Sequence, residues 1–155
     1  MSNLLLTPEE AAQLTGLDLA GNNRPLIDVN TILVAQLALL QPALGSDLYD
    51  ALGEGSYQQF VANYLKLPLS LWIKALLLQT SILRLGSMGA VKASAQYIKP
   101  ASERDIALAV NVLRSQARML LRGALDHLAA NRNDYPEYKP LPRRLLRRLD
   151  GGIIL

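Results

Sequence analysis

The stretch PLSLWIKALLLQTSILRLGSMGAVKASAQY, from Pro68 to Tyr97, decides the fold of this chain. It is the most apolar segment, and its hydrophobic residues lie on nearly every side of a helical projection. A helix that is apolar all round is buried in a protein core or in a membrane. Lys74 and Arg84 interrupt the run, whereas a membrane span needs about 20 predominantly apolar residues. The segment therefore predicts a central core helix that starts at Pro68, and no membrane contact.

A second long helix is predicted after Pro100, which should end the first one. Ser102 and Asp105 have the spacing of a capping box, and helical periodicity continues to about Asn131. The apolar positions of this helix recur every three or four residues and form one seam. The seam consists of Ile106, Val110, Leu113, Ala117, Leu120, Ala124 and Leu128. Two long helices in succession predict an antiparallel pair at the centre of a bundle.

Two shorter helices are predicted near the N-terminus. Thr7 and Glu10 form a capping box at the start of the first helix, and Gly16 is placed to end it. Asp28 is a suitable N-cap for the second helix, which Pro42 should kink or end.

Two further short helices are predicted between Gly45 and the core helix. Gly45 breaks the chain, and Ser46 should cap a two-turn helix that the glycines at 53 and 55 end. Ser56 should open the next helix, whose apolar stripe includes Tyr57, Phe60, Val61, Tyr64 and Leu65.

Composition agrees with a helical fold. The chain has 155 residues, which suits a single domain, and half of them are hydrophobic, enough for a sizeable core. Aromatic residues are only 5%, whereas Leu and Ala dominate, which favours helices over a sandwich or barrel. Cysteine is absent, which excludes disulfides and thiolate metal sites. We therefore expect an all-α bundle of about five or six helices with an extended C-terminal arm.

The charge is distributed unevenly. Residues 1–138 carry 11 Lys and Arg against 12 Asp and Glu, a net charge of −1. Residues 139–155 carry five basic residues against one acidic residue, a net charge of +4. Pro136, Pro140 and Pro142 should stiffen the connection between the two parts. We therefore divide the chain into a helical domain, residues 1–138, and a basic arm, residues 139–155.

The arm ends in LPRRLLRRLDGGIIL, which alternates arginine pairs with leucines and finishes with a glycine-hinged apolar end. Its first part would be a short amphipathic helix, marginal in water unless it packs on a partner. We interpret the arm as a binding segment for a protein partner. The residues assigned to this contact are Arg143, Arg144, Leu145, Leu146, Arg147, Arg148, Leu149, Ile153, Ile154 and Leu155. Nonspecific attraction to DNA phosphates, attachment to an anionic membrane surface, and a disordered terminus remain as alternatives.

Chemistry-bearing patterns are scarce. The sequence has no nucleophile elbow, phosphate-binding loop or metal-ligand motif, and its single histidine, His127, has no partner in sequence. We therefore predict no catalytic, cofactor-binding or metal site, and no enzyme. Arg114, Arg118 and Arg122 recur every four residues and should form a basic stripe opposite the apolar seam. Such a stripe is either a solvated face or an electrostatic contact with an acidic neighbour or with DNA.

Several turn and packing motifs between residues 28 and 138 resemble those of one protein family. The first motif is an apolar helix that ends in a Pro-x-Leu-Gly turn and is followed by a helix with a Leu-Tyr pair. The second is a core helix that starts with proline and carries an aromatic residue. The third is a Tyr-Pro-x-Tyr segment near the end of the domain. The residues concerned are Pro42, Leu44, Gly45, Leu48, Tyr49, Pro68, Trp72, Tyr135, Pro136 and Tyr138. This outline is similar to that of head–tail connector (adaptor) proteins of tailed phages and prophages.

The resemblance implies a structural virion protein. Copies would form a dodecameric homo-oligomeric ring beneath the portal protein, around the DNA channel and next to tail or stopper proteins. The protein would be found in the virion neck, and in the host cytoplasm during assembly. C-terminal arms in such rings dock on the portal or on an adjacent subunit, and the arginine stripe would face the channel. An accessory protein that binds DNA or an anionic membrane through the basic arm is the alternative.

Overall fold

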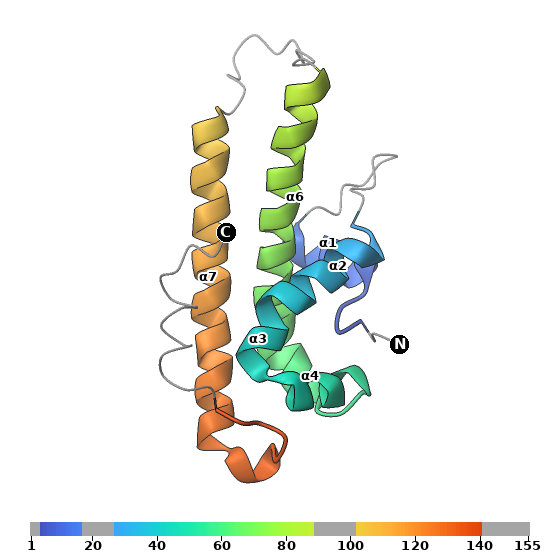
Figure 1. Cartoon of the computed structure of the whole chain (residues 1–155), viewed down its shortest axis with the longest axis vertical. Coiled ribbons are helices and arrows are strands. Elements are labelled where there is room, and N and C mark those ends of the chain that lie inside the picture. The colour runs from blue at the N-terminus through green and yellow to red at the C-terminus, as the bar shows by residue number, and fades with distance from the viewer. Residues whose placement is uncertain (1–3, 17–26, 89–101, 141–155) are drawn as a thin grey trace.

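The computed structural model of the chain describes residues 4–16, 27–88 and 102–140, with side chains for all of these except 81–88. All regular elements within these residues are helical, which confirms the all-α prediction (Figure 1). The elements in chain order are α1 (Pro8–Thr15), α2 (Val29–Ala35), η1 (Gln36–Leu40), α3 (Gln41–Leu44), α4 (Ser46–Gly53), α5 (Gln58–Phe60), η2 (Val61–Leu65), α6 (Lys66–Met88), α7 (Glu103–Ala130) and η3 (Arg132–Asp134).

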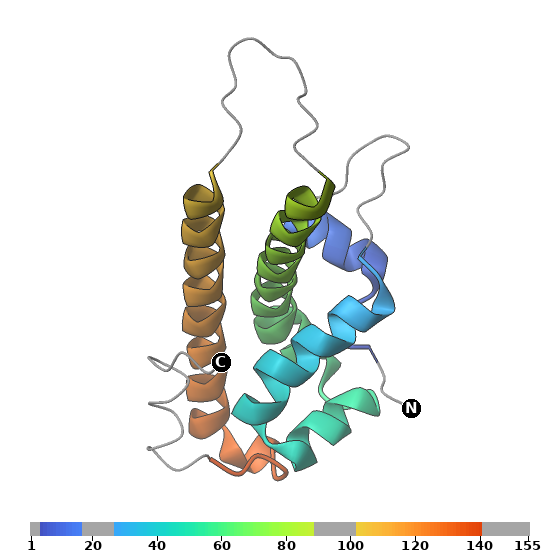
Figure 2. The ribbon, with the colours of Figure 1, turned by 45° about the horizontal axis from the view of Figure 1, so that its top comes forward.

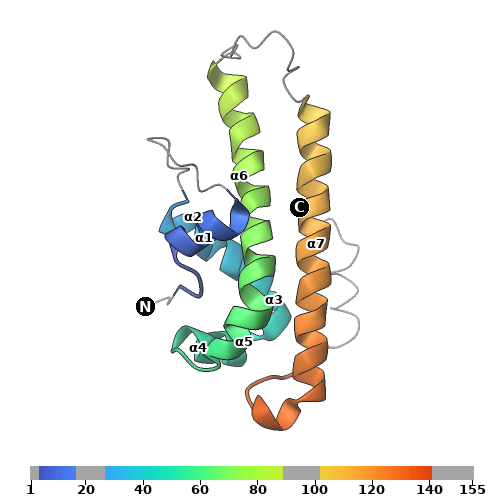
Figure 3. The same ribbon diagram turned by 180° about the vertical axis from the view of Figure 1, so that it is seen from behind.

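The two long helices α6 and α7 run antiparallel and side by side, as predicted (Figures 1 and 3). α1 and α2 pack on the other side of α6, so this helix lies between α7 and the N-terminal helices. The core joins residues from all of these elements. Its largest fully buried side chains include Leu6, Ile32, Leu40, Leu44, Leu48, Leu65, Leu69, Ile73 and Leu128. The apolar segment that opens the sequence analysis is therefore a core helix.

By length and composition alone, the helical stretch Gln58–Thr80 is long and apolar enough to cross a membrane. Its most apolar window is 39% buried inside the protein, against α7 on one side and α1 and α2 on the other. A core helix passes the same test, because burial in a protein and burial in lipid select the same residues.

The N-terminal caps match their prediction. The Thr7 hydroxyl accepts a hydrogen bond from the Glu10 N–H (3.2 Å), the Glu10 carboxylate accepts one from the Thr7 N–H (3.1 Å), and Gly16 ends α1 with φ +67°. Glycine adopts this left-handed backbone conformation at little energetic cost. Asp28 caps α2 through the Thr31 N–H, and Ser102 forms the capping box of α7.

Both prolines expected to interrupt or start helices lie inside helices instead. α2, η1 and α3 form one diagonal rod that passes through Pro42 and ends at Gly45 (Figure 2). Likewise, the helix that contains Pro68 begins at Gln58. A proline ring clashes with the carbonyl four residues earlier. Each of those carbonyls belongs to a wide π-helical turn, η1 or η2, which makes room for the ring.

Two predicted caps are also corrected. Gly45, with φ +83°, is the N-cap of α4, and Ser46 is already helical. Tyr57, not Ser56, precedes α5, and it is the only described non-glycine residue with a positive φ (+57°). Its ring lies 4.9 Å from that of Tyr135, and its hydroxyl donates to Glu137 (2.7 Å). These contacts hold the unfavourable backbone conformation in place.

Gln36 is a buried polar residue that joins three parts of the fold. Its side chain is 0% exposed; its carbonyl oxygen accepts a hydrogen bond from the Leu5 N–H (2.9 Å), and its amide donates to the Tyr49 hydroxyl (3.1 Å). Buried polar groups are stable only when paired in this way. Gln36 therefore fixes the N-terminal segment and α4 against the diagonal rod.

We expect Gln36→Leu to lower the free energy of unfolding by about 2 kcal/mol, because the Leu5 N–H and the Tyr49 hydroxyl lose their partner. Urea denaturation followed by circular dichroism measures the change. Tyr49→Phe, which removes one of the two bonds, is the matched control and should cost about 1 kcal/mol. Equal stability of Gln36→Leu and the natural protein would show that the pairing is unimportant.

Candidate functional site

The predicted arginine stripe does not lie opposite the apolar seam. Arg114 and Arg118 are half-buried at the edge of the α6–α7 interface, and only Arg122 is exposed. Four residues exceed one helical turn, so each step in the stripe rotates by about 40° around the helix. The stripe therefore begins beside the seam and turns outward only towards its end.

Trp72 of α6 is the partner of the first two arginines. The guanidinium carbons of Arg114 and Arg118 lie 5.3 Å and 5.6 Å from the centre of its ring, within cation–π range. Arg114 also donates a hydrogen bond from Nη2 to Oε1 of Gln79 (2.6 Å). These contacts fix both guanidinium groups beside α6, at the edge of the α6–α7 interface.

The seam itself follows the prediction with one shift. Val110, Ala117, Ala124 and Leu128 are buried as expected, but Leu121 is buried while Leu120 is only half-buried. Ile106 and Leu113 are also half-buried. The periodicity located the correct side of the helix, and packing selected the residue at its centre.

The outward face of α7 carries exposed apolar residues beside charged ones, among them Arg122 and Asp126. Leu108, Val112 and Met119 are 56%, 54% and 67% exposed, and their spacing of four and seven residues places them on one line opposite the buried seam. We call these three residues the α7 stripe. Single exposed apolar residues are ordinary, but an aligned set on one helix face is typical of a protein contact surface.

A second exposed apolar surface lies on the diagonal rod. Val34 and Leu37 are 55% and 50% exposed, on the side of the rod that faces away from its buried residues. We call these two residues the rod patch. The whole rod, Val29–Leu44, contains no charged residue. A solvated helix face normally carries charges, so this composition also indicates a covered surface.

An aromatic cluster closes the base of the bundle around His127. The imidazole stacks on Tyr64, with ring centres 4.5 Å apart, and its Nε2 lies 3.4 Å from the Tyr135 hydroxyl. Phe60 also stacks on it at 5.9 Å. The Tyr-Pro-x-Tyr segment is therefore packed on the helices, and the His127 ring acts as a packing element within an aromatic group.

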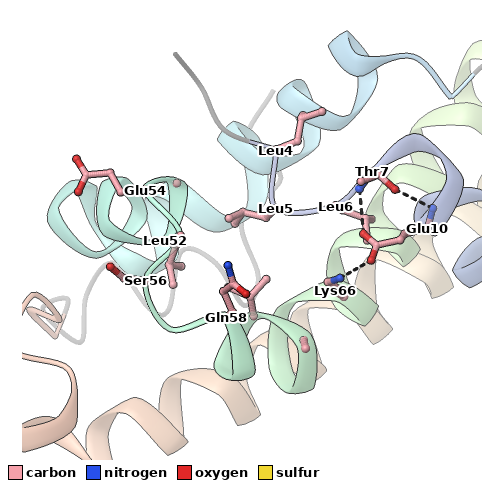
Figure 4. Close-up of a pocket in the computed structure, with 14 residues that line it drawn as sticks. Leu4, Leu5, Leu6, Thr7, Glu10, Leu52, Glu54, Ser56, Gln58 and Lys66 are labelled. Atoms are coloured by element: carbon pink, nitrogen blue, oxygen red, sulfur yellow. Dashed lines mark hydrogen bonds and ion pairs between the residues drawn. The ribbon is translucent and has the colours of Figure 1, made fainter.

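A groove of about 450 Å³ lies between the N-terminal segment and the α4–α5 turn (Figure 4). Leu5, Leu6 and Leu52 line it, together with the Glu10–Lys66 ion pair (2.6 Å) at one end. The hydrogen bond from Lys66 lowers the pKa of the Glu10 carboxyl, and the cap at Thr7 lowers it further. Lys66 and Glu10 satisfy each other, and the second carboxylate of the lining belongs to Glu54 of the α4–α5 turn.

The side chains that could ligate a metal ion are dispersed within the described residues. No group of three or more His, Asp or Glu side chains that could hold a metal ion occurs within them. Among residues 4–16, 27–80 and 102–140, the partners of His127 are aromatic rings and Asn131, and no carboxylate is hydrogen-bonded to it.

The arm begins at the base of the bundle. Tyr138 packs against the core, and Lys139 forms an ion pair with Asp47 of α4, which lowers the pKa of that carboxyl through the hydrogen bond. The described chain stops at Pro140. The partner-binding residues assigned to the arm, Arg143–Leu149 and Ile153–Leu155, lie outside the described residues.

The described residues define a small helical-bundle protein with exposed apolar side chains on α7 and on the rod. The chain belongs to a family of unknown function, DUF6712, whose model matches residues 36–144. The match begins at Gln36, includes α7 and the Tyr-Pro-x-Tyr segment, and ends at Arg144 in the arm. Comparison with curated proteins gave no match, and comparison with solved structures gave none either.

Replacing His127 with Ala should lower the free energy of unfolding by about 1–3 kcal/mol, because the stacked ring is lost from the aromatic cluster. His127→Phe keeps a ring at this position and should recover most of that loss. Thermal or urea denaturation of the two variants measures both effects. If the alanine variant unfolds like the natural protein, the ring is not a packing element.

The free energy of unfolding should decrease in acid, because the Glu10 carboxyl becomes protonated. Its folded-state pKa is lowered, so its contribution is complete above the pKa of the unfolded chain and is lost as the pH falls through the folded value. We therefore expect the denaturation midpoint to fall from about pH 5 downward. Glu10→Gln should show a flatter pH profile in that range. A profile of the same slope in both proteins would contradict the assignment.

Proposed function

We propose that this protein is a structural, ring-forming head–tail connector of a tailed phage or prophage, placed between the portal and the tail around the DNA channel. The observation that carries the proposal is the α7 stripe, an aligned set of exposed apolar residues on the longest helix. A surface of this kind fits a protein whose work is to contact other proteins.

The resemblance noted in the sequence supports the same reading. Pro42 and Gly45 lie at the bend between the rod and α4, Trp72 lies at the α6–α7 interface, and Tyr135 and Tyr138 pack the end of the domain on the bundle. These residues pack the helices together, and their resemblance to the motifs of connector proteins is the support that they give to the proposal. The basic arm then leaves from the base of the bundle, where it can reach a neighbour.

The arm carries the second candidate function. Its net charge of +4, against −1 for residues 1–138, favours phosphate contact, and nonspecific binding to DNA or to an anionic membrane would use the same arginines. Arg114 and Arg118 are held on Trp72 at the α6–α7 interface, so we assign this role to the arm.

Deleting residues 141–155 should leave the helical domain folded and weaken assembly with the portal. The helices and core described above do not include these residues, so circular dichroism and the denaturation midpoint should change little. Negative-stain microscopy of each form mixed with the portal protein of the same phage or prophage measures ring formation. A strict monomer that ignores the portal would count heavily against the connector proposal.

The same truncation separates the two candidates. If DNA binding by the arm is the function, the full chain binds duplex DNA with a steep dependence on salt, and the truncated chain does not. Anionic vesicles test the membrane form in the same way. Absence of binding by the full chain at low salt removes this alternative.

A further inference from the structure

One face of α4 is acidic. Asp47, Asp50 and Glu54 are exposed, and their spacing of three and four residues places them on one line. This line is opposite the buried Leu48 and Leu52. The last of the three carboxylates lies where α4 ends, and the negative end of a helix dipole also attracts cations. We call the three residues the acidic face, and a cationic segment is the neighbour that it favours.

The chain already brings one cation to the acidic face. Lys139, the first residue of the arm, forms an ion pair with Asp47 at the start of α4. The other two carboxylates, Asp50 and Glu54, have no cationic partner among the residues that the structure describes. The described chain stops at Pro140, one residue after this contact. The arm therefore begins on the surface whose remaining charges are unmatched.

The acidic face leads to the groove between the N-terminal segment and the α4–α5 turn (Figure 4). Glu54 belongs to both surfaces, while Leu5, Leu6 and Leu52 give the groove an apolar lining. A hollow of about 450 Å³ with such walls is suited to apolar groups. From Asp47 to Glu54 the path along α4 is about 10 Å, at about 1.5 Å per residue.

We propose that the arm of each free chain docks on its own domain, with its four arginines along the acidic face and its apolar end, Ile153–Leu155, in the groove. The order of the arm matches the order of the surface, since the arginines come first after Lys139 and the apolar residues come last. The residues after Pro140 span up to about 50 Å when extended, which exceeds the path along α4. This contact goes beyond the connector function and is tested without the portal.

Charge and tethering identify the arm as the occupant. Residues 45–60 contain three carboxylates and no lysine or arginine, a net charge of −3, against +4 for residues 139–155. DNA and anionic membranes are repelled by the same carboxylates. A tethered segment acts at a high effective concentration, so the arm of the same chain is favoured over that of a second copy. Exposed ion pairs are weak and screened by salt, so the docked arm stays displaceable by a partner.

Trypsin measures docking in the isolated chain, because it cleaves after the arginines of the arm. The natural chain is compared with a double variant that combines Asp50→Asn with Glu54→Gln. We expect the double variant to lose the arm at least fivefold faster at low salt, as followed by mass spectrometry, and about 0.5 M salt to remove the difference. Equal cleavage rates at low salt would overturn the proposal.

A double variant that combines Glu9→Gln with Glu103→Gln is the matched control. It removes two negative charges from exposed residues of α1 and α7, outside the acidic face. Its arm should be cleaved at the rate of the natural chain, and circular dichroism checks that all three proteins are folded. If the control loses its arm as fast as the α4 variant, net charge alone sets the rate and the docking surface is wrong.

Disulfide trapping tests the groove, since the natural chain contains no cysteine. Gln58 is exposed and lines the groove, whereas Val112 is exposed on α7, which contributes no residue to it. Oxidation of a chain with Gln58→Cys and Ile154→Cys should close a disulfide within one monomer, at least tenfold more than in a chain with Val112→Cys and Ile154→Cys. Equal closure in both chains would overturn the placement of the apolar end. A disulfide-linked dimer would assign the groove to the arm of a second copy and overturn docking within one chain.

Discussion

α6 is apolar on almost every side, and the other helices cover the part of it that lies in the core. α7 covers one side and α1 and α2 cover another, while Lys74 reaches the Thr15 carbonyl at the end of α1 (3.0 Å). A cation near the C-terminus of a helix is favourable, so Lys74 of α6 also holds α1 in place. The burial of α6 therefore determines where α1, α2 and α7 must lie.

The two π-helical turns keep the apolar helices continuous despite their prolines. η1 precedes Pro42 and η2 precedes Pro68, and in each case the widened turn contains the carbonyl that the ring would otherwise strike. The consequence is an uninterrupted rod, Val29–Leu44, and a helix that continues from Gln58 into α6. Without that continuity the rod would not present a single uncharged face to solvent.

α7 carries two different apolar faces. Its seam packs on the bundle, and its outer stripe remains exposed, while the arginines between them are drawn to Trp72. This division explains why two of the four arginines of α7 lie at the α6–α7 interface, whereas Arg104 and Arg122 are exposed.

The sequence by itself determined the helical class, the two long helices and most caps, because capping residues and apolar periodicity act over a few residues of chain. The aromatic cluster at His127, the role of Trp72 and the two exposed faces were decided only by the tertiary structure. Tyr64 and Tyr135 are far apart in sequence, and the arginines at 114 and 118 choose between solvent and Trp72 only when α6 and α7 meet. Contacts between distant segments depend on packing, which no local pattern encodes.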